Sequence, residues 1–80
     1  MSLERQALKG RQSERKQRLM ELAIEIKGLV RGIRFSTPMD VPVEDYKEGE
    51  ILALATRLRD LKAQYTAIKF EYDEAEKELA

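Results

Sequence analysis

The stretch that decides the fold is ILALATRLRDLKAQYTAIKFEYDEAEKEL, residues 51–79. Its apolar side chains recur at alternating intervals of three and four residues, at Ile51, Leu54, Leu58, Leu61, Tyr65, Ile68, Tyr72, Ala75 and Leu79. This spacing is typical of a helix that packs along a second helix in a coiled coil. We therefore predict one long amphipathic helix in this half of the chain.

A shorter run of the same pattern lies in the first half of the chain. The spacing is kept by Leu19, Leu22, Ile26, Leu29 and Ile33. Upstream, residues 9–18 (KGRQSERKQR) carry no apolar side chain, but helix propensity stays high through them. We expect a first helix over about residues 3–34 and a second over about residues 43–79.

Two prolines separate the predicted helices. Pro38 and Pro42 cannot donate backbone hydrogen bonds, and each disfavours helical angles in the residue before it. We therefore expect a loop over about residues 35–42. Directly after it, Glu44 and Asp45 would place negative charge at the positive end of the second helix's dipole.

A chain that folds back at these prolines forms a single all-α domain, an antiparallel two-helix hairpin with coiled-coil-like packing. The residue numbers of facing pairs should then sum to about 77, so that Ile26 faces Ile51. Charge favours the same arrangement. Residues 1–34 hold nine Lys or Arg and four Asp or Glu, whereas residues 35–80 hold six and eleven. Folding back places the basic beginning of the chain beside its acidic end.

A lone hairpin buries one stripe of each helix, which barely offsets the entropy of ordering the chain. In the predicted register, Leu61 and Tyr65 face the apolar-poor basic stretch. Either Arg and Lys stems cover these side chains, or a second copy completes a four-helix bundle by dimerisation; we favour the dimer. The residues predicted for self-association are Leu19, Leu22, Ile26, Leu29, Leu54, Leu58, Leu61, Tyr65 and Ile68. A candidate second surface consists of Ile24, Gly28 and Phe70.

Two glycines, Gly28 and Gly32, lie in the first predicted helix with the spacing GxxxG. Glycine costs about 1 kcal/mol in a helix interior, so the pair needs a reason. Both explanations stay open: the glycines let a partner helix approach closely, or they loosen the turns before the loop.

The composition argues against catalysis. The chain has no histidine and no cysteine, which removes the usual general base, the thiol nucleophile and most transition-metal ligands. The acidic residues between 71 and 78 lack the glycine turn of a calcium loop. We expect no enzymatic activity, no cofactor and no metal.

These observations predict a small structural or adaptor protein that acts by protein–protein association, as a homodimer and with a further protein partner. No apolar run is long enough for a membrane span, and neither a signal peptide nor a disulfide framework is indicated, so we expect a soluble cytoplasmic protein. The alternative is a nucleic-acid-associated regulator. Its candidate phosphate contacts are Lys9, Arg11, Arg15, Lys16 and Arg18.

Overall fold

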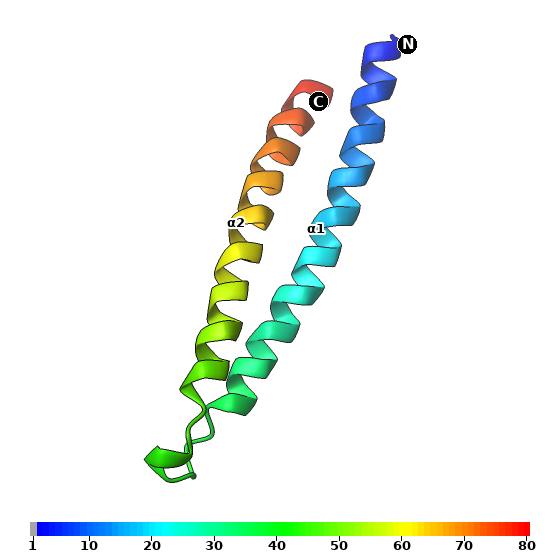
Figure 1. The fold of residues 1–80 in the computed structure, drawn as a ribbon. Coiled ribbons are helices and arrows are strands. Elements are labelled where there is room, and N and C mark those ends of the chain that lie inside the picture. The colour runs from blue at the N-terminus through cyan, green and yellow to red at the C-terminus, as the bar shows by residue number, and fades with distance from the viewer. Residues whose placement is uncertain (1) are drawn as a thin grey trace.

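The computed structural model describes residues 2–80. These form helix α1 (Leu3–Ser36), a single 3-10 turn η1 (Val43–Asp45) and helix α2 (Glu48–Leu79), with no strands among them. The two long helices lie side by side and run in opposite directions, so both ends of the chain lie at one end of a rod (Figure 1). The rod measures 64 × 15 × 14 Å. The predicted all-α two-helix hairpin is confirmed.

Local hydrogen bonds define the two ends of α1. At its start, the side chain of Ser2 accepts a hydrogen bond from the backbone N–H of Arg5 at 3.2 Å, which is the usual role of an N-cap serine. At its end, Oγ1 of Thr37 donates to the carbonyl of Ile33 at 2.8 Å, and its backbone N–H donates to the carbonyl of Arg34 at 3.3 Å. Because the threonine caps the last turn, α1 continues past the predicted end at residue 34.

The connection is longer than predicted, and the second helix begins later. Residues 43–45 form the separate turn η1, and α2 begins only at Glu48. The hydroxyl of Tyr46 donates to the carbonyl of Pro38 at 2.7 Å, which ties the two sides of the connection together. The first turn of α2 therefore holds Glu48 and Glu50, and these carboxylates replace the predicted pair at the positive end of the helix dipole.

The seam between the helices follows the predicted spacing. All nine apolar positions predicted in α2 are buried or half-buried, with Leu61 and Ala75 the most enclosed. In α1 the predicted positions from Leu19 to Ile33 are also buried or half-buried. The same alternation continues upstream through Arg15 and Gln12, where the sequence offers no apolar side chain.

Gln12 forms a polar layer inside this seam. Its side chain is only 5% exposed. Its Nε2 donates to the carbonyl of Tyr72 at 2.9 Å and to Oε1 of Glu76 at 3.0 Å, while its Oε1 accepts a hydrogen bond from Nη1 of Arg15 at 2.9 Å. Arg15 also lies 3.7 Å from a carboxylate oxygen of Glu71. A satisfied polar group at one seam position favours one alignment of the two helices over its neighbours.

The observed register differs from the predicted one by about one heptad. Three pairs measure it directly: Arg5 with Leu79, Arg18 with Gln64, and Glu25 with Arg57. Their residue numbers sum to 82–84, whereas the predicted register required about 77, so the predicted pairing of Ile26 with Ile51 is wrong. The cause is the connection, whose midpoint moves to residue 42 when α1 ends at Ser36 and α2 begins at Glu48.

This register can be measured with a pair of spin labels. Lys16→Cys and Lys69→Cys place both labels at nearly one level of the rod, since their residue numbers sum to 85, one more than those of Arg5 and Leu79. We expect a short label separation, because a slip by one heptad would move the labels about 10 Å apart along the axis. Pulsed electron spin resonance on the doubly labelled chain gives the distance. A separation that matches the slipped alignment would contradict this register.

The role of Gln12 can be tested with Gln12→Leu. We expect the thermal midpoint to rise, because an apolar side chain replaces a buried amide at a seam position. We also expect the label distance described above to broaden or split, because the polar layer no longer penalises a slipped alignment. Circular dichroism gives the midpoint and spin resonance the distance. A narrow, unchanged distance in this variant would mean that the connection alone sets the register.

Candidate interaction surfaces

The residues predicted for self-association lie within the hairpin. All nine occupy seam positions between α1 and α2, and Leu22 and Leu61 are almost fully buried, with 0% and 1% exposure. In the observed register Leu61 lies opposite Leu22, and Tyr65 lies opposite Leu19, so neither faces the basic stretch. The hairpin itself covers Leu61, whereas Tyr65 is half-buried.

The predicted second surface is exposed, but it is divided. Ile24 is 70% exposed, and it forms a row along the outer side of α1 with Met20, which is 56% exposed, and with the exposed Gly28. We call these three residues the outer row. Phe70 is 67% exposed on α2, at the level of residue 14 of α1, which is about 15 Å from the level of Ile24. It does not belong to the same patch.

The two glycines of the GxxxG spacing have different surroundings. A methyl group added at Gly32 would lie 3.3 Å from Cδ1 of Leu54, so this glycine faces α2 and allows close approach within the hairpin. A methyl group added at Gly28 would meet nothing within 4 Å. No residue of the described chain has the positive φ that would itself favour glycine. The packing of the hairpin therefore explains Gly32 and leaves Gly28 unexplained.

The five predicted phosphate contacts do not form one face. Arg15 lies in the seam and is engaged by Gln12 and Glu71. Arg18 approaches Glu21 and, across the seam, Gln64, each at 3.5 Å. The other three are exposed, with Lys9 and Lys16 directly following seam residues and Arg11 directly preceding one. The basic stretch is thus spread over both sides of the rod and its interior.

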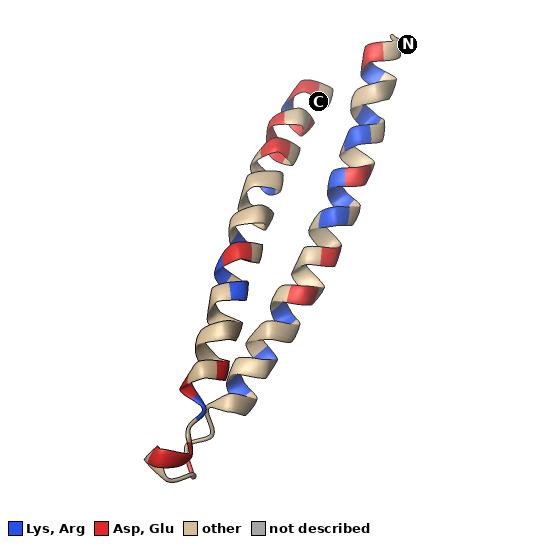
Figure 2. Ribbon diagram, viewed as in Figure 1, with Lys and Arg blue, Asp and Glu red and all other residues tan. Residues whose placement is uncertain are grey.

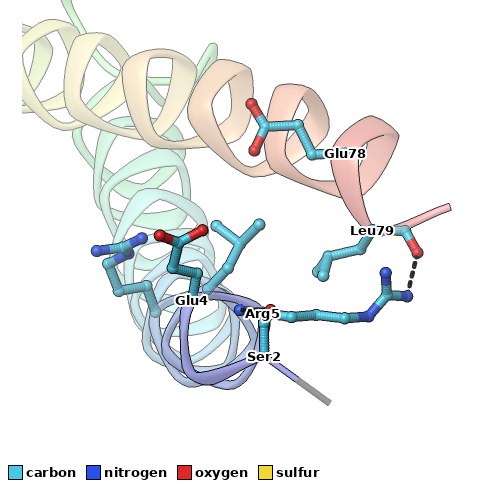
Figure 3. A pocket seen from close by; sticks show the side chains of 7 residues that line it. Ser2, Glu4, Arg5, Glu78 and Leu79 are labelled. Atoms are coloured by element: carbon cyan, nitrogen blue, oxygen red, sulfur yellow. Dashed lines mark hydrogen bonds between the residues drawn. The ribbon is translucent and has the colours of Figure 1, made fainter.

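At the open end of the hairpin, cations of α1 meet the acidic end of α2. Figure 2 shows this meeting of basic and acidic bands along the two helices. Nη2 of Arg5 donates to the carbonyl of Leu79 at 2.8 Å (Figure 3). A cation is favourable there because the last carbonyls of a helix carry partial negative charge. The shallow pocket at this end also contains Glu4 and Glu78, and the charges of its walls largely compensate one another.

A second hollow lies midway along the rod, and sequence reasoning did not find it. Its walls come from Ala23, Ile26 and Lys27 of α1 and from Lys62 and Tyr65 of α2, and they are apolar almost throughout. The surface is concave because Ala23 leaves space beside the larger side chains of Ile26 and Tyr65. The sequence pattern does place two of its residues together. Ala23 and Lys62 directly follow the two most buried leucines, so they border the seam on the same side.

Lys69 lies near this hollow and is engaged by its own helix. Its Nζ donates to Oδ1 of Asp73 at 2.9 Å and lies 5.5 Å from the centre of the Tyr72 ring. The hydrogen bond with Asp73 and the charge of that carboxylate raise the pKa of Lys69 above its usual range. Within residues 2–80, no cluster of three or more acidic side chains has a geometry that could hold a metal ion.

Comparison of the chain with protein-family models, with curated proteins and with solved structures found no significant match. Neither α1 nor α2 contains an apolar stretch long enough to cross a bilayer, nor does any other helix of the described chain.

The open surroundings of Gly28 predict the effect of Gly28→Ala. In the isolated hairpin we expect the free energy of unfolding to increase by about 0.5–1 kcal/mol, because alanine restricts the unfolded chain and favours the helix. Gly10→Ala is the matched control, since Gly10 lies in the same helix with equally open surroundings. Urea denaturation at low concentration provides the measurement. Destabilisation by Gly28→Ala alone would show that another surface packs against residue 28.

Proposed function

We propose that this chain is a non-catalytic association module of the cytoplasm, a small structural or adaptor protein that acts by packing its helices against other helices. The absence of histidine and cysteine supports a function without catalysis. The rod shape supports contact along its length, because both helices present a side to solvent at every level.

One observation carries the proposal: the hairpin leaves much of its apolar surface uncovered. Only Leu19, Leu22, Leu61 and Ala75 are buried apolar residues in the described chain. Large apolar side chains on both helices remain more than half exposed, among them Met20, Ile24, Leu52 and Phe70. Such a hairpin gains stability when a further helix covers this surface.

Self-association is the simplest form of this packing. A second copy brings two helices at once, and two hairpins together make a four-helix bundle. The outer row supports a contact between copies of α1, because Met20, Ile24 and Gly28 follow one another at intervals of four residues. Ridges at this spacing pack into one another, and glycine permits close approach of the two backbones. This contact would explain Gly28.

The alternative function, nucleic-acid association, receives less support. Phosphate binding depends on several cations that face the same side. The five candidates instead divide between the seam and the two sides of α1, and two of them are engaged by Glu71 and Glu21.

Sedimentation equilibrium over a micromolar concentration series tests self-association. We expect a dimer that is weakened at least about tenfold by Ile24→Gln, because each copy loses apolar burial at the interface. Gly28→Ala should also weaken it, although the same substitution stabilises the isolated hairpin.

Two controls locate the dimer interface. Phe70→Gln removes an equally exposed side chain away from the outer row and should leave the dimer intact, and Gly10→Ala should do the same. A wild-type chain that stays monomeric throughout the series would exclude the dimer. Dissociation by Phe70→Gln, with no effect of Ile24→Gln, would place the interface on α2.

A further inference from the structure

The two long sides of the rod differ in how their charges are arranged. Residues that directly precede a seam residue lie on one side, which we call the arginine flank. Across this flank, Arg57 pairs with Glu25 at 3.7 Å, and Arg18 lies 3.5 Å from the side-chain oxygen of Gln64. Cations of one helix thus meet acidic or neutral partners on the other, and the arginine flank needs no further ligand.

Residues that directly follow a seam residue lie on the opposite side, which we call the lysine flank. In the observed register Lys16 lies opposite Lys69, and Lys62 lies opposite Ala23, so no carboxylate of the other helix faces these cations. Lys69 pairs with Asp73 on its own helix. Within residues 2–80, Lys16, Lys27 and Lys62 form no ion pair. The middle of this flank therefore has uncompensated positive charge.

The apolar hollow lies in the middle of the lysine flank. Its floor is Ala23, Ile26 and Tyr65, and Lys27 and Lys62 border it from the two helices. The aliphatic part of each lysine side chain adds to the apolar wall of the hollow, while its ammonium group extends into solvent at the rim. A ligand that fits must therefore present an apolar strip to the floor and negative charge along both edges of that strip.

We propose that the lysine flank binds an amphipathic helix of another protein whose apolar stripe is bordered by Asp or Glu, and that this helix completes a three-helix bundle. The inference rests on the proposed function, since it assumes that the hairpin works by helix packing. The span from the level of Lys16 to that of Lys27 corresponds to about three helical turns, so a short helix is sufficient.

A second copy of the chain is a poorer occupant of the hollow. Its own lysine flank offers apolar surface but would bring lysines against lysines. Its arginine flank offers carboxylates, but those at its middle, Glu21, Glu25 and Asp60, already pair within the copy, and the flank exposes Gly28 where an apolar side chain is needed. Neither side of the hairpin combines an apolar strip with available negative charge. The outer row remains the surface for self-association.

Three designed peptides of about 18 residues test the inference. The first is an amphipathic helix with Leu and Ile in one stripe and Glu along both edges, the second replaces Glu by Lys, and the third has the composition of the first in a scrambled order. Fluorescence anisotropy of each peptide, titrated with the full chain, gives the Kd. Amide chemical shifts of the isotope-labelled full chain, titrated with each peptide, give the location of the binding site. We expect only the first peptide to bind, with shifts centred on Ala23, Lys27, Lys62 and Tyr65.

Charge-reversed variants test the role of the lysines. Lys27→Glu with Lys62→Glu should weaken binding of the Glu-edged peptide by about tenfold and allow the Lys-edged peptide to bind. The matched control is Arg11→Glu with Lys77→Glu, which changes the net charge equally at exposed positions away from the hollow. Ala23→Gln fills the hollow without changing charge, and it should also abolish binding of the first peptide.

Several results would overturn the inference. Equal binding of the scrambled peptide would show that charge alone is recognised. Equal binding of the Lys-edged peptide to the wild-type chain would exclude recognition of an acidic helix, but it would leave the proposed function, helix packing, in place. The same residues shifting with chain concentration, without peptide, would make a second copy the occupant. Binding of a nucleic-acid duplex there, and of no peptide, would identify a phosphate site. No peptide binding, together with a strict monomer, would remove both this inference and the proposed function.

Discussion

The hydrogen bonds of Gln12 across the seam are the interaction on which the arrangement of this hairpin depends. Apolar seam residues repeat every heptad, so sliding α2 by seven residues exchanges one apolar layer for another of similar size. The amide of Gln12 is not interchangeable in this way, because it needs the carbonyl of Tyr72 and the carboxylate of Glu76 at one level. A slip of one heptad would place Tyr65 and Lys69 at this level, so the buried amide would lose the Glu76 carboxylate that accepts its hydrogen bond, which is costly.

The arginine flank favours the same alignment for a separate reason. In the observed register Glu25 meets Arg57, and Arg18 meets Gln64. After a slip of one heptad from this alignment, Arg18 would face Arg57, and Glu25 would face Glu50. Each exposed pair contributes little alone. The slip would nevertheless replace one pair of opposite charges and one contact with a neutral side chain by two pairs of like charges. The flank charges therefore favour the same alignment as the polar layer.

The sequence contained enough to predict the helices but not their alignment. The spacing from Ile51 to Leu79 identified every enclosed position of α2, because burial alone produces that period. In α1, sequence reasoning missed Gln12 and Arg15, since hydrophobicity cannot mark polar side chains as seam residues. The register was predicted wrongly because a heptad pattern matches equally well after a shift of seven residues. Only the length of the connection, which includes the turn η1, distinguishes the two alignments.

The hollow shows how register and surface chemistry are connected. Sequence reasoning placed Leu61 and Tyr65 opposite the apolar-poor basic stretch, because that conclusion depends on which residues face each other. In the observed alignment, Tyr65 lies beside Ala23 and Ile26. A slip of one heptad would move the Tyr65 ring toward Gln12 and place Ala55 opposite Ala23. The hollow would then lose the aromatic ring from its floor and Lys62 from its edge. The polar layer at Gln12 therefore does more than align two helices, because an apolar residue there would remove the constraint that keeps this binding surface assembled.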